Sequence, residues 1–390
     1  MTIFFYKNTI LPCFAVISNN YIKMNFIVSC HSCAEYDVRK ILPLLEKIYT
    51  CAQGPELAGK TVLLKPNILS DAYPNKAVTT HPVFVEAVIR FLQSRKTGKI
   101  FVGDAPAMHS SSFKPLKSGI YDVCEKTGSE WAYFGEKTAT LSLSSRKIPV
   151  TSLVHEVDYY FSLPKLKTHE LMGFTGAVKN TFGLIPHMHK AKQHAFHRNS
   201  RSMAKLLIDL NERITPDFIF MDAISAMEGA GPGNGQPFPL HLLLGSTNLL
   251  ALDIVATKII GYNPLEIETN VEGLKRKKWL SSIQDIVLEG VNIEDVIRND
   301  FKIIQQISTW KMSVNTILRS IPLFRSKLKR MPVFIKNRCT GCKACINICP
   351  VQALHIHLQN PQKVILDSKK CISCFCCHEV CPSNAIEING

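Results

Sequence analysis

Two short runs of cysteines near the C-terminus constrain this chain of 390 residues more than any other feature. Nine of its fourteen cysteines fall between Cys339 and Cys381. The first run has the spacing C-x2-C-x2-C-x3-C-P over residues 339–350, and the second repeats it over residues 371–382. Disulfide pairing does not require such crowding, whereas metal binding does.

Iron explains this spacing better than any other metal. Three thiolates at two-residue intervals reach three irons of a cubane, and the fourth cysteine of each run crosses to the other cluster, as in bacterial ferredoxins. The sequence therefore predicts two 4Fe-4S clusters. One is held by Cys339, Cys342, Cys345 and Cys381, and the other by Cys371, Cys374, Cys377 and Cys349.

The two runs also indicate an internal duplication with a period of 32 residues and a short strand after each Cys-Pro. The alternative is a pair of zinc knuckles, but zinc gives no reason for the crossing Cys-Pro.

Cys376 stands between ligands and is interpreted as a packing residue. The remaining cysteines are scattered and are interpreted as structural thiols. Free thiols and iron–sulfur clusters together indicate a reducing cytoplasm.

The larger N-terminal region has the pattern of an α/β layered domain with a mainly parallel sheet. Near-continuous apolar runs, typical of strands covered on both faces, occupy residues 61–67, 99–105, 158–169 and 217–223. Residues 81–95 and 200–214 have the apolar spacing of covering helices. Residues 240–261 contain charged side chains and are predicted to be a buried strand followed by a helix, not a membrane span.

Polar side chains stand where these predicted strands end. Because ligands of parallel sheets bind at the carboxyl ends of the strands, we expect these polar side chains to line one crevice. Candidates for catalysis are Lys165, Lys167, His169 and Asp104, with Lys65, Asn67 and Asp222 nearby. Candidates for binding a cofactor are Lys179, Asn180, Gly229 and Gly231, the glycines lying in a loop whose amides could approach an anion.

Each of these features has a plainer alternative. Asp104 and Asp222 could cap the helices that follow them. The glycine-rich loop at 227–237 matches no nucleotide-binding motif, so ordinary turn chemistry is favoured. Four histidines between residues 187 and 197 could ligate a metal, but interleaved lysines favour a solvated basic loop.

The motifs LLKPN, TTHP, VGDAP, LPKLKTHELMGFTGAVKNTFGL, AMEGAGPGNG and LALDIVA follow one another in this order. In that order they resemble domain-of-unknown-function family 362, whose members often carry a C-terminal dicluster ferredoxin domain. The resemblance implies an α/β fold over residues 24–310 but no established reaction. The chain is also distantly similar to the N-terminal domain of lactate racemase-type proteins, in which a lysine and histidines serve a nickel-pincer cofactor. We do not assign that cofactor to Lys165, Lys167 or His169 of this chain.

The expected organisation is an N-terminal extension at 1–23, an α/β domain at 24–310, a basic linker at 311–332 and a small α+β iron–sulfur domain at 333–390.

The formal charge of +15 would suggest a polyanionic partner. Two clusters of roughly −2 each reduce the excess to about +11. No membrane span is expected.

Two functions remain open at this point. The first is redox: low-potential clusters pass electrons to or from a partner protein, or an anionic small molecule bound by the α/β domain, as in an oxidoreductase or an electron carrier. The second is a phosphate- or nucleic-acid-binding module with structural clusters, for which the basic residues 311–338 would serve. No recognised nucleic-acid motif supports the second.

Overall fold

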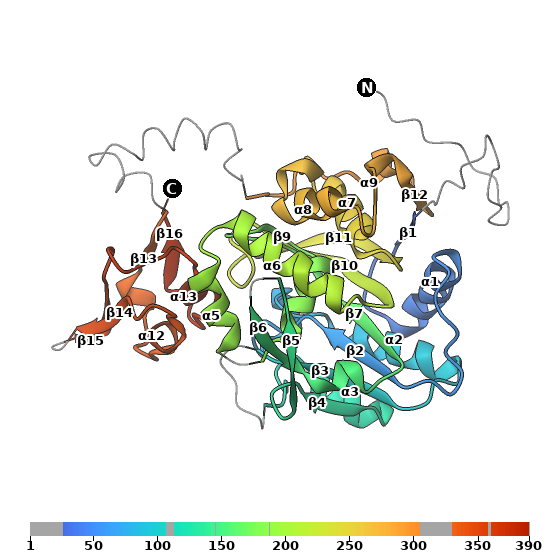
Figure 1. Ribbon diagram of the computed structural model, residues 1–390, viewed down its shortest axis with the longest axis horizontal. Coiled ribbons are helices and arrows are strands. Elements are labelled where there is room, and N and C mark those ends of the chain that lie inside the picture. Colours follow the sequence, from blue (N-terminus) through green and yellow to red (C-terminus); the bar gives the residue numbers. More distant parts are fainter. Residues whose placement is uncertain are drawn as a thin grey trace.

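The computed structural model describes residues 26–106, 113–144, 146–186, 188–304, 330–357 and 360–389. A large α/β domain carries a small iron–sulfur domain at one side, with helix α5 between them (Figure 1). The predicted N-terminal extension, and the basic linker up to residue 329, lie outside the described residues.

The α/β domain is built on a ten-stranded sheet with the order β12-β1-β11-β10-β7-β2-β3-β4, and β8 and β9 continue from β10. Six of its nine strand pairings are parallel, which confirms the expected mainly parallel sheet. Its strands are β1 (Phe26–Ser32), β2 (Val62–Pro66), β3 (Ile100–Asp104), β4 (Glu130–Tyr133), β7 (Tyr159–Leu163), β8 (Lys165–His169), β9 (Gly173–Thr175), β10 (Phe218–Glu228), β11 (Gln236–Ser246) and β12 (Ile286–Glu289). A separate hairpin pairs β5 (Thr138–Ser142) with β6 (Lys147–Thr151).

Helices cover both faces of this sheet (Figure 1). One face carries α1 (Val38–Cys51), α2 (Pro82–Ser94) and α3 (Ile120–Thr127); the other carries α4 (Ala177–Asn180), α6 (Ser200–Arg213), α7 (Leu249–Ile259) and α8 (Glu268–Arg276). Helices α5 (His189–Phe196) and α9 (Ile293–Val296) complete the domain. The helices predicted at 81–95 and 200–214, and the strand and helix predicted at 240–261, are confirmed.

Local chemistry explains where the covering helices begin. Pro82 opens α2, and the side chain of His81 accepts the amide hydrogen of Val83. Asn248 caps α7 by accepting from the amides of Leu250 and Ala251. These caps satisfy amides that have no partner within the helix.

The run at 158–169 is not one strand, as the sequence suggested, but two. Pro164 divides it, so that β7 pairs with β2 and β10, whereas β8 pairs with a later part of β10 and with β9. A proline cannot donate the hydrogen bond that a continuous ladder would need there. The break separates β8 from β7, and β8 ends at His169, which contacts Glu379 of the iron–sulfur domain.

The iron–sulfur domain has two antiparallel strand pairs and two short helices. Its elements are β13 (Pro332–Phe334), α12 (Ala344–Ile348), β14 (Leu354–His357), β15 (Asn360–Leu366), α13 (Cys376–Glu379) and β16 (Ile386–Ile388). Left-handed backbone recurs at the predicted period of 32 residues, at Gly341 and Ser373, Lys343 and Phe375, and Gln352 and Asn384. The internal duplication, with a strand after each Cys-Pro, is therefore confirmed.

Candidate functional site

Four cysteines of the iron–sulfur domain line one cavity. These are Cys339, Cys342, Cys345 and Cys381, called the outer cysteine set, and the cavity is closed by apolar side chains such as Phe334 and Ile386. Burial, together with the other three thiols of the set, raises the pKa of the Cys345 thiol to about 11. The structure thus brings Cys381 from the second run to three cysteines of the first, as crossed ligation requires.

The other four cysteines form the inner cysteine set, Cys349, Cys371, Cys374 and Cys377. Burial raises the pKa of Cys377 well above its usual range, and Cys374, Cys345, Cys371 and Cys349 add to the effect. In the described part of the chain, no three His, Cys, Asp or Glu side chains are grouped closely enough to hold a single metal ion.

Backbone amides donate to sulfurs in both repeats. The amide of Ala353 lies 3.2 Å from Sγ of Cys349, and that of Ala385 lies 3.2 Å from Sγ of Cys381. The amide of Ser373 lies 3.4 Å from Sγ of Cys371. Donors to sulfur stabilise a thiolate, so the loops already fit ligands of an iron cluster.

Cys376 does not belong to either set. It is buried in an apolar group with Ala191 of α5 and Ile348 of α12. The partly buried Met188, Cys374 and Val380 pack against the same group. The predicted packing role of Cys376 agrees with this placement. Through these contacts the inner cysteine set faces α5 and the α/β domain.

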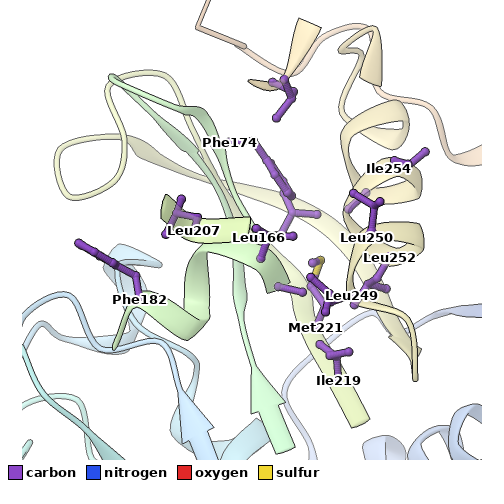
Figure 2. Packing of buried hydrophobic residues seen from close by; sticks show 14 of the residues in the cluster. Leu166, Phe174, Phe182, Leu207, Ile219, Met221, Leu249, Leu250, Leu252 and Ile254 are labelled. Atoms are coloured by element: carbon purple, nitrogen blue, oxygen red, sulfur yellow. The ribbon is translucent and has the colours of Figure 1, made fainter. Parts of the chain in front are cut away.

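Strand β8 carries the predicted lysines and histidine toward this junction. Side chains alternate along a strand, so Lys165, Lys167 and His169 share one face. Leu166 points the other way, into the core beneath α7, near Phe174 and Leu250 (Figure 2). All five residues of β8 are buried, which makes the polar face unusual.

Two lysines of the predicted crevice have their own carboxylates. Nζ of Lys65 lies 3.1 Å from Oδ2 of Asp104, and Nζ of Lys165 lies 2.8 Å from Oδ2 of Asp222. All four side chains are at most 3% exposed. Asp104 and Asp222 are therefore partners of buried lysines. They do not cap a following helix with their side chains, although Asp222 accepts from the amide of His81, just before α2.

Tyr36 and His81 complete the Lys165 pair, and the sequence analysis missed both. The Tyr36 hydroxyl donates to Oδ1 of Asp222 at 2.7 Å and accepts from Nζ of Lys165 at 2.8 Å. Its ring stacks on that of His81, with 3.6 Å between the centroids. Tyr36 lies outside every motif, and although His81 belongs to the TTHP motif, nothing in that motif indicates its contact with Tyr36, which only the tertiary fold creates.

Lys167 differs from its neighbours on β8. Its Nζ donates to the carbonyl oxygen of Val78 at 2.7 Å, and the side chain is 1% exposed. Burial lowers the pKa of Lys167 well below its usual range, and the nearby charge of Lys179 lowers it further. A carbonyl dipole compensates a buried ammonium less well than a carboxylate does.

His169 links the two domains. Its Nε2 lies 3.3 Å from Oε1 of Glu379, a residue of α13 between two cluster cysteines. Nδ1 accepts from the amides of Leu171 and Met172, so the neutral ring carries its proton on Nε2. Burial lowers the pKa of His169 to about 4, which keeps the ring neutral near pH 7.

Positive and polar side chains of the α/β domain lie near Glu379. Burial raises the pKa of its carboxyl, but His169, Lys179 and His194 together lower it to about 2. His194 is 6% exposed, and its Nδ1 has no hydrogen-bond partner among the described residues. The backbone carbonyl of Glu379 also lies against Gly233 of the β10–β11 loop. Glu379 and His194 were missed because their contacts join distant segments.

Three of the four predicted cofactor-binding residues, Asn180, Gly229 and Gly231, have structural partners. Asn180 accepts from Nζ of Lys65 and donates to the hydroxyl of Ser162. The amide of Gly229 donates to the carbonyl of Lys302, and that of Gly231 donates to the carbonyl of Gly229. Neither glycine amide is left for an anion in this arrangement, so anion binding there stays a prediction.

The histidine-rich stretch is not the solvated loop that its composition suggested. Residues 189–196 form α5, with Ala191, Gln193 and His194 buried. The prediction was wrong because the iron–sulfur domain covers one side of this helix, through Cys376 and Ile348. His187 lies outside the described residues.

Comparison with known families agrees with this architecture. Residues 62–258 match the model of the domain of unknown function DUF362, and residues 338–385 match a 4Fe-4S dicluster domain. The chain belongs to the DUF362 family. This DUF362 member is also an iron–sulfur protein, since its second domain is a 4Fe-4S dicluster domain.

Relatives add limited information about this DUF362 chain. It is 34% identical over 213 residues to the thylakoid-associated protein sll1697 of Synechocystis sp., a match that covers 54% of this chain and 66% of the relative. The apoprotein of lactate racemase from Thermoanaerobacterium thermosaccharolyticum aligns over 60% of this chain and 57% of its own, at 12% identity and a TM-score of 0.38. A Thermotoga maritima protein aligns over 52% and 53%, at 16% identity and a TM-score of 0.33. Neither structural likeness is close enough to indicate an activity.

None of the helices described for this DUF362 chain combines the length and the apolar character needed to cross a bilayer.

Proposed function

We propose that this chain is a redox protein that passes electrons between a partner protein and the α/β domain through two 4Fe-4S clusters. The outer and inner cysteine sets would each hold one cluster. Such a cluster accepts and returns one electron at low potential, near −400 mV or below in related centres.

The observation that carries the proposal is the position of Glu379. This residue stands between Cys377 of the inner set and Cys381 of the outer set, yet its carboxylate is buried against His169 of β8. A merely appended electron carrier would not need to bury a carboxylate inside its neighbour, because burying a charge is costly. The contact supports a functional connection between the clusters and the strand ends.

The chain's own residues have three tasks in this proposal. The thiols of both sets bind iron, and the amides of Ala353, Ala385 and Ser373 stabilise the sulfurs. Helix α5 excludes water from the inner set through Ala191. Neutral His169 directs the proton on its Nε2 at Oε1 of Glu379 and so positions the residue that stands between Cys377 and Cys381.

The acceptor within the α/β domain is proposed to be an anionic small molecule. A cavity lined by Tyr36, Tyr73, His81 and Ser225 opens at the carboxyl edge of the sheet, beside the Lys165–Asp222 pair. Ligands of open α/β sheets bind at this edge. A reducing compartment such as the cytoplasm suits the free thiols of the chain.

Anaerobic stopped-flow spectroscopy tests the electron-transfer step. The iron-loaded chain is mixed with reduced methyl viologen, and the loss of the visible cluster absorbance is followed; oxidised viologen is then added in excess to reverse it. We expect rapid bleaching and full recovery over repeated cycles. Clusters that bind iron but do not bleach with this donor would be structural, and the proposal would fail.

A further inference from the structure

Each cysteine run ends in a five-residue loop, and the two loops match in backbone but not in their third side chain. Residues 349–353 read CPVQA, and residues 381–385 read CPSNA. The fourth residue of each loop is left-handed, with the same φ of 50°. In each loop the amide of the final alanine lies 3.2 Å from the sulfur of the cysteine. The duplication therefore allows a direct comparison of Val351 with Ser383.

Ser383 contacts the sulfur of a predicted cluster ligand. Its Oγ lies 3.7 Å from Sγ of Cys381, and both side chains line the cavity of the outer cysteine set. A thiolate bound to iron carries no proton, so in the iron-loaded chain the hydroxyl is the donor of this hydrogen bond. The sulfur of Cys381 thus accepts from two groups, this hydroxyl and the amide of Ala385.

Val351 cannot make the same contact at the other cluster. It stands two positions after Cys349, a predicted ligand of the inner cysteine set, and a valine side chain has no hydrogen-bond donor. The sulfur of Cys349 accepts from the amide of Ala353, as its counterpart does in the second loop. The hydroxyl of Ser383 is therefore a difference between two matching loops. It acts on the outer set, whose Cys342 is exposed.

We infer that Ser383 raises the reduction potential of the outer cluster and so makes this cluster easier for a partner protein to reduce. Hydrogen bonds to the sulfurs are among the factors that set the potential of an iron–sulfur cluster. Reduction adds negative charge to the cluster, and a donor aimed at a ligand sulfur stabilises that added charge. The inference deepens the proposed function, on which it rests, by naming a residue that adjusts the driving force for electron entry.

Anaerobic potentiometry followed by EPR tests this inference on the iron-loaded chain. One electron from dithionite enters a cluster at each step, and no covalent bond forms or breaks. Ser383→Ala should lower one of the two potentials and leave the other unchanged. We expect about a fivefold fall in the equilibrium constant for reduction, which is about 41 mV for a one-electron couple. Ser383→Thr keeps the hydroxyl and should therefore retain the wild-type potentials.

Val351→Ser places a hydroxyl at the matching position of the first loop. It should raise the potential that Ser383→Ala leaves unchanged, because the new donor stands beside Cys349 of the inner set in a loop of the same backbone shape. This variant adds a donor and removes none, so it tests the inference even if Ser383→Ala assembles no cluster. Unchanged potentials in both variants, or a rise of the potential that Ser383→Ala lowers, would overturn the inference.

Ser368→Ala is the matched control, because it removes the same hydroxyl from an exposed position of the same domain and should leave both potentials unchanged. If dithionite reduces no cluster in the wild-type chain, the proposed function itself fails. If both clusters are reducible but Ser383→Ala and Ser368→Ala have the same potentials, only the role of Ser383 fails. Iron content measured on every variant shows whether both clusters were assembled.

Discussion

Nε2 of His169 and Oε1 of Glu379 lie 3.3 Å apart, although 210 positions separate the two residues in the chain. This contact joins the end of strand β8 to the end of helix α13, between two predicted cluster ligands. It brings the lysine-rich edge of the sheet and the iron–sulfur domain into one site.

Glu379→Gln should destabilise the iron-loaded chain. The substitution keeps the size of the side chain but removes the negative charge that faces His169 and lies near Lys179, and leaving a nearby cation without its counter-charge costs about 3 kcal/mol. We expect the midpoint of thermal denaturation to fall by roughly 5 °C at a fixed scan rate.

Glu387→Gln is the matched control, since Glu387 pairs with Arg338 at 2.8 Å but is exposed. An exposed pair contributes little, so its midpoint should change by less than about 1 °C. Equal midpoints of thermal denaturation for the two variants would show that Glu379 does not stabilise the contact between the domains.

Lys65→Met and Asp104→Asn should each destabilise the chain, because each leaves the other charge buried and unpaired. The expected cost is about 3 kcal/mol for either single variant. In the double variant no unpaired charge remains, so its loss should be at least about 1 kcal/mol smaller than the sum. Strict additivity, measured by denaturation of the three variants, would mean that the 3.1 Å pair is not coupled.

Asp253 should give stability a measurable dependence on pH. Its carboxylate accepts from the amides of Ala177 and Val178, which begin the helix that carries Lys179. Burial raises the pKa of Asp253 from 3.8 to about 7. The folded chain thus binds a proton that the unfolded chain has released, so stability falls as pH rises from about 4 to 7 and is then level.

Asp253→Asn removes that dependence, although it also weakens the helix cap at every pH. Between pH 5 and pH 8 the stability of the variant relative to wild type should therefore improve, by on the order of 1–3 kcal/mol. Denaturation midpoints across this range measure the difference. A constant difference would mean that Asp253 stays ionised in the folded chain.

Two neighbouring cysteines should respond differently to substitution. Cys374→Ala removes a ligand of the inner set and should cost up to about four irons per chain. Cys376→Ala removes a packing contact with Ala191 and Ile348 and a side-chain hydrogen bond with Cys374, but it removes no predicted ligand, so iron should be retained. Iron and protein assays on both variants test the assignment; equal iron loss would make Cys376 a ligand.

Local patterns predicted much of this molecule. The cysteine spacing, the period of 32 residues and the alternation along residues 165–169 each depend on neighbours in the chain. Strand ends of a parallel sheet converge, so the meeting of Lys65 with Asp104 and of Lys165 with Asp222 could also be expected. Only the structure shows that these residues form buried ion pairs.

Contacts between distant segments could not be predicted. Glu379 looked like an ordinary residue of a cysteine loop, and Tyr36 stood outside every motif. The composition of residues 187–198 suggested a solvated loop, but docking of the iron–sulfur domain buries part of it as α5. For Gly229 and Gly231, only the structure shows that both amides already have acceptors.

The most direct test of the central claim is iron quantification combined with EPR on anaerobically purified chain, before and after dithionite reduction. We expect about eight irons per chain, and reduced signals from two clusters close enough to interact magnetically. Fewer than about six irons per chain, or no reducible signal, would contradict it.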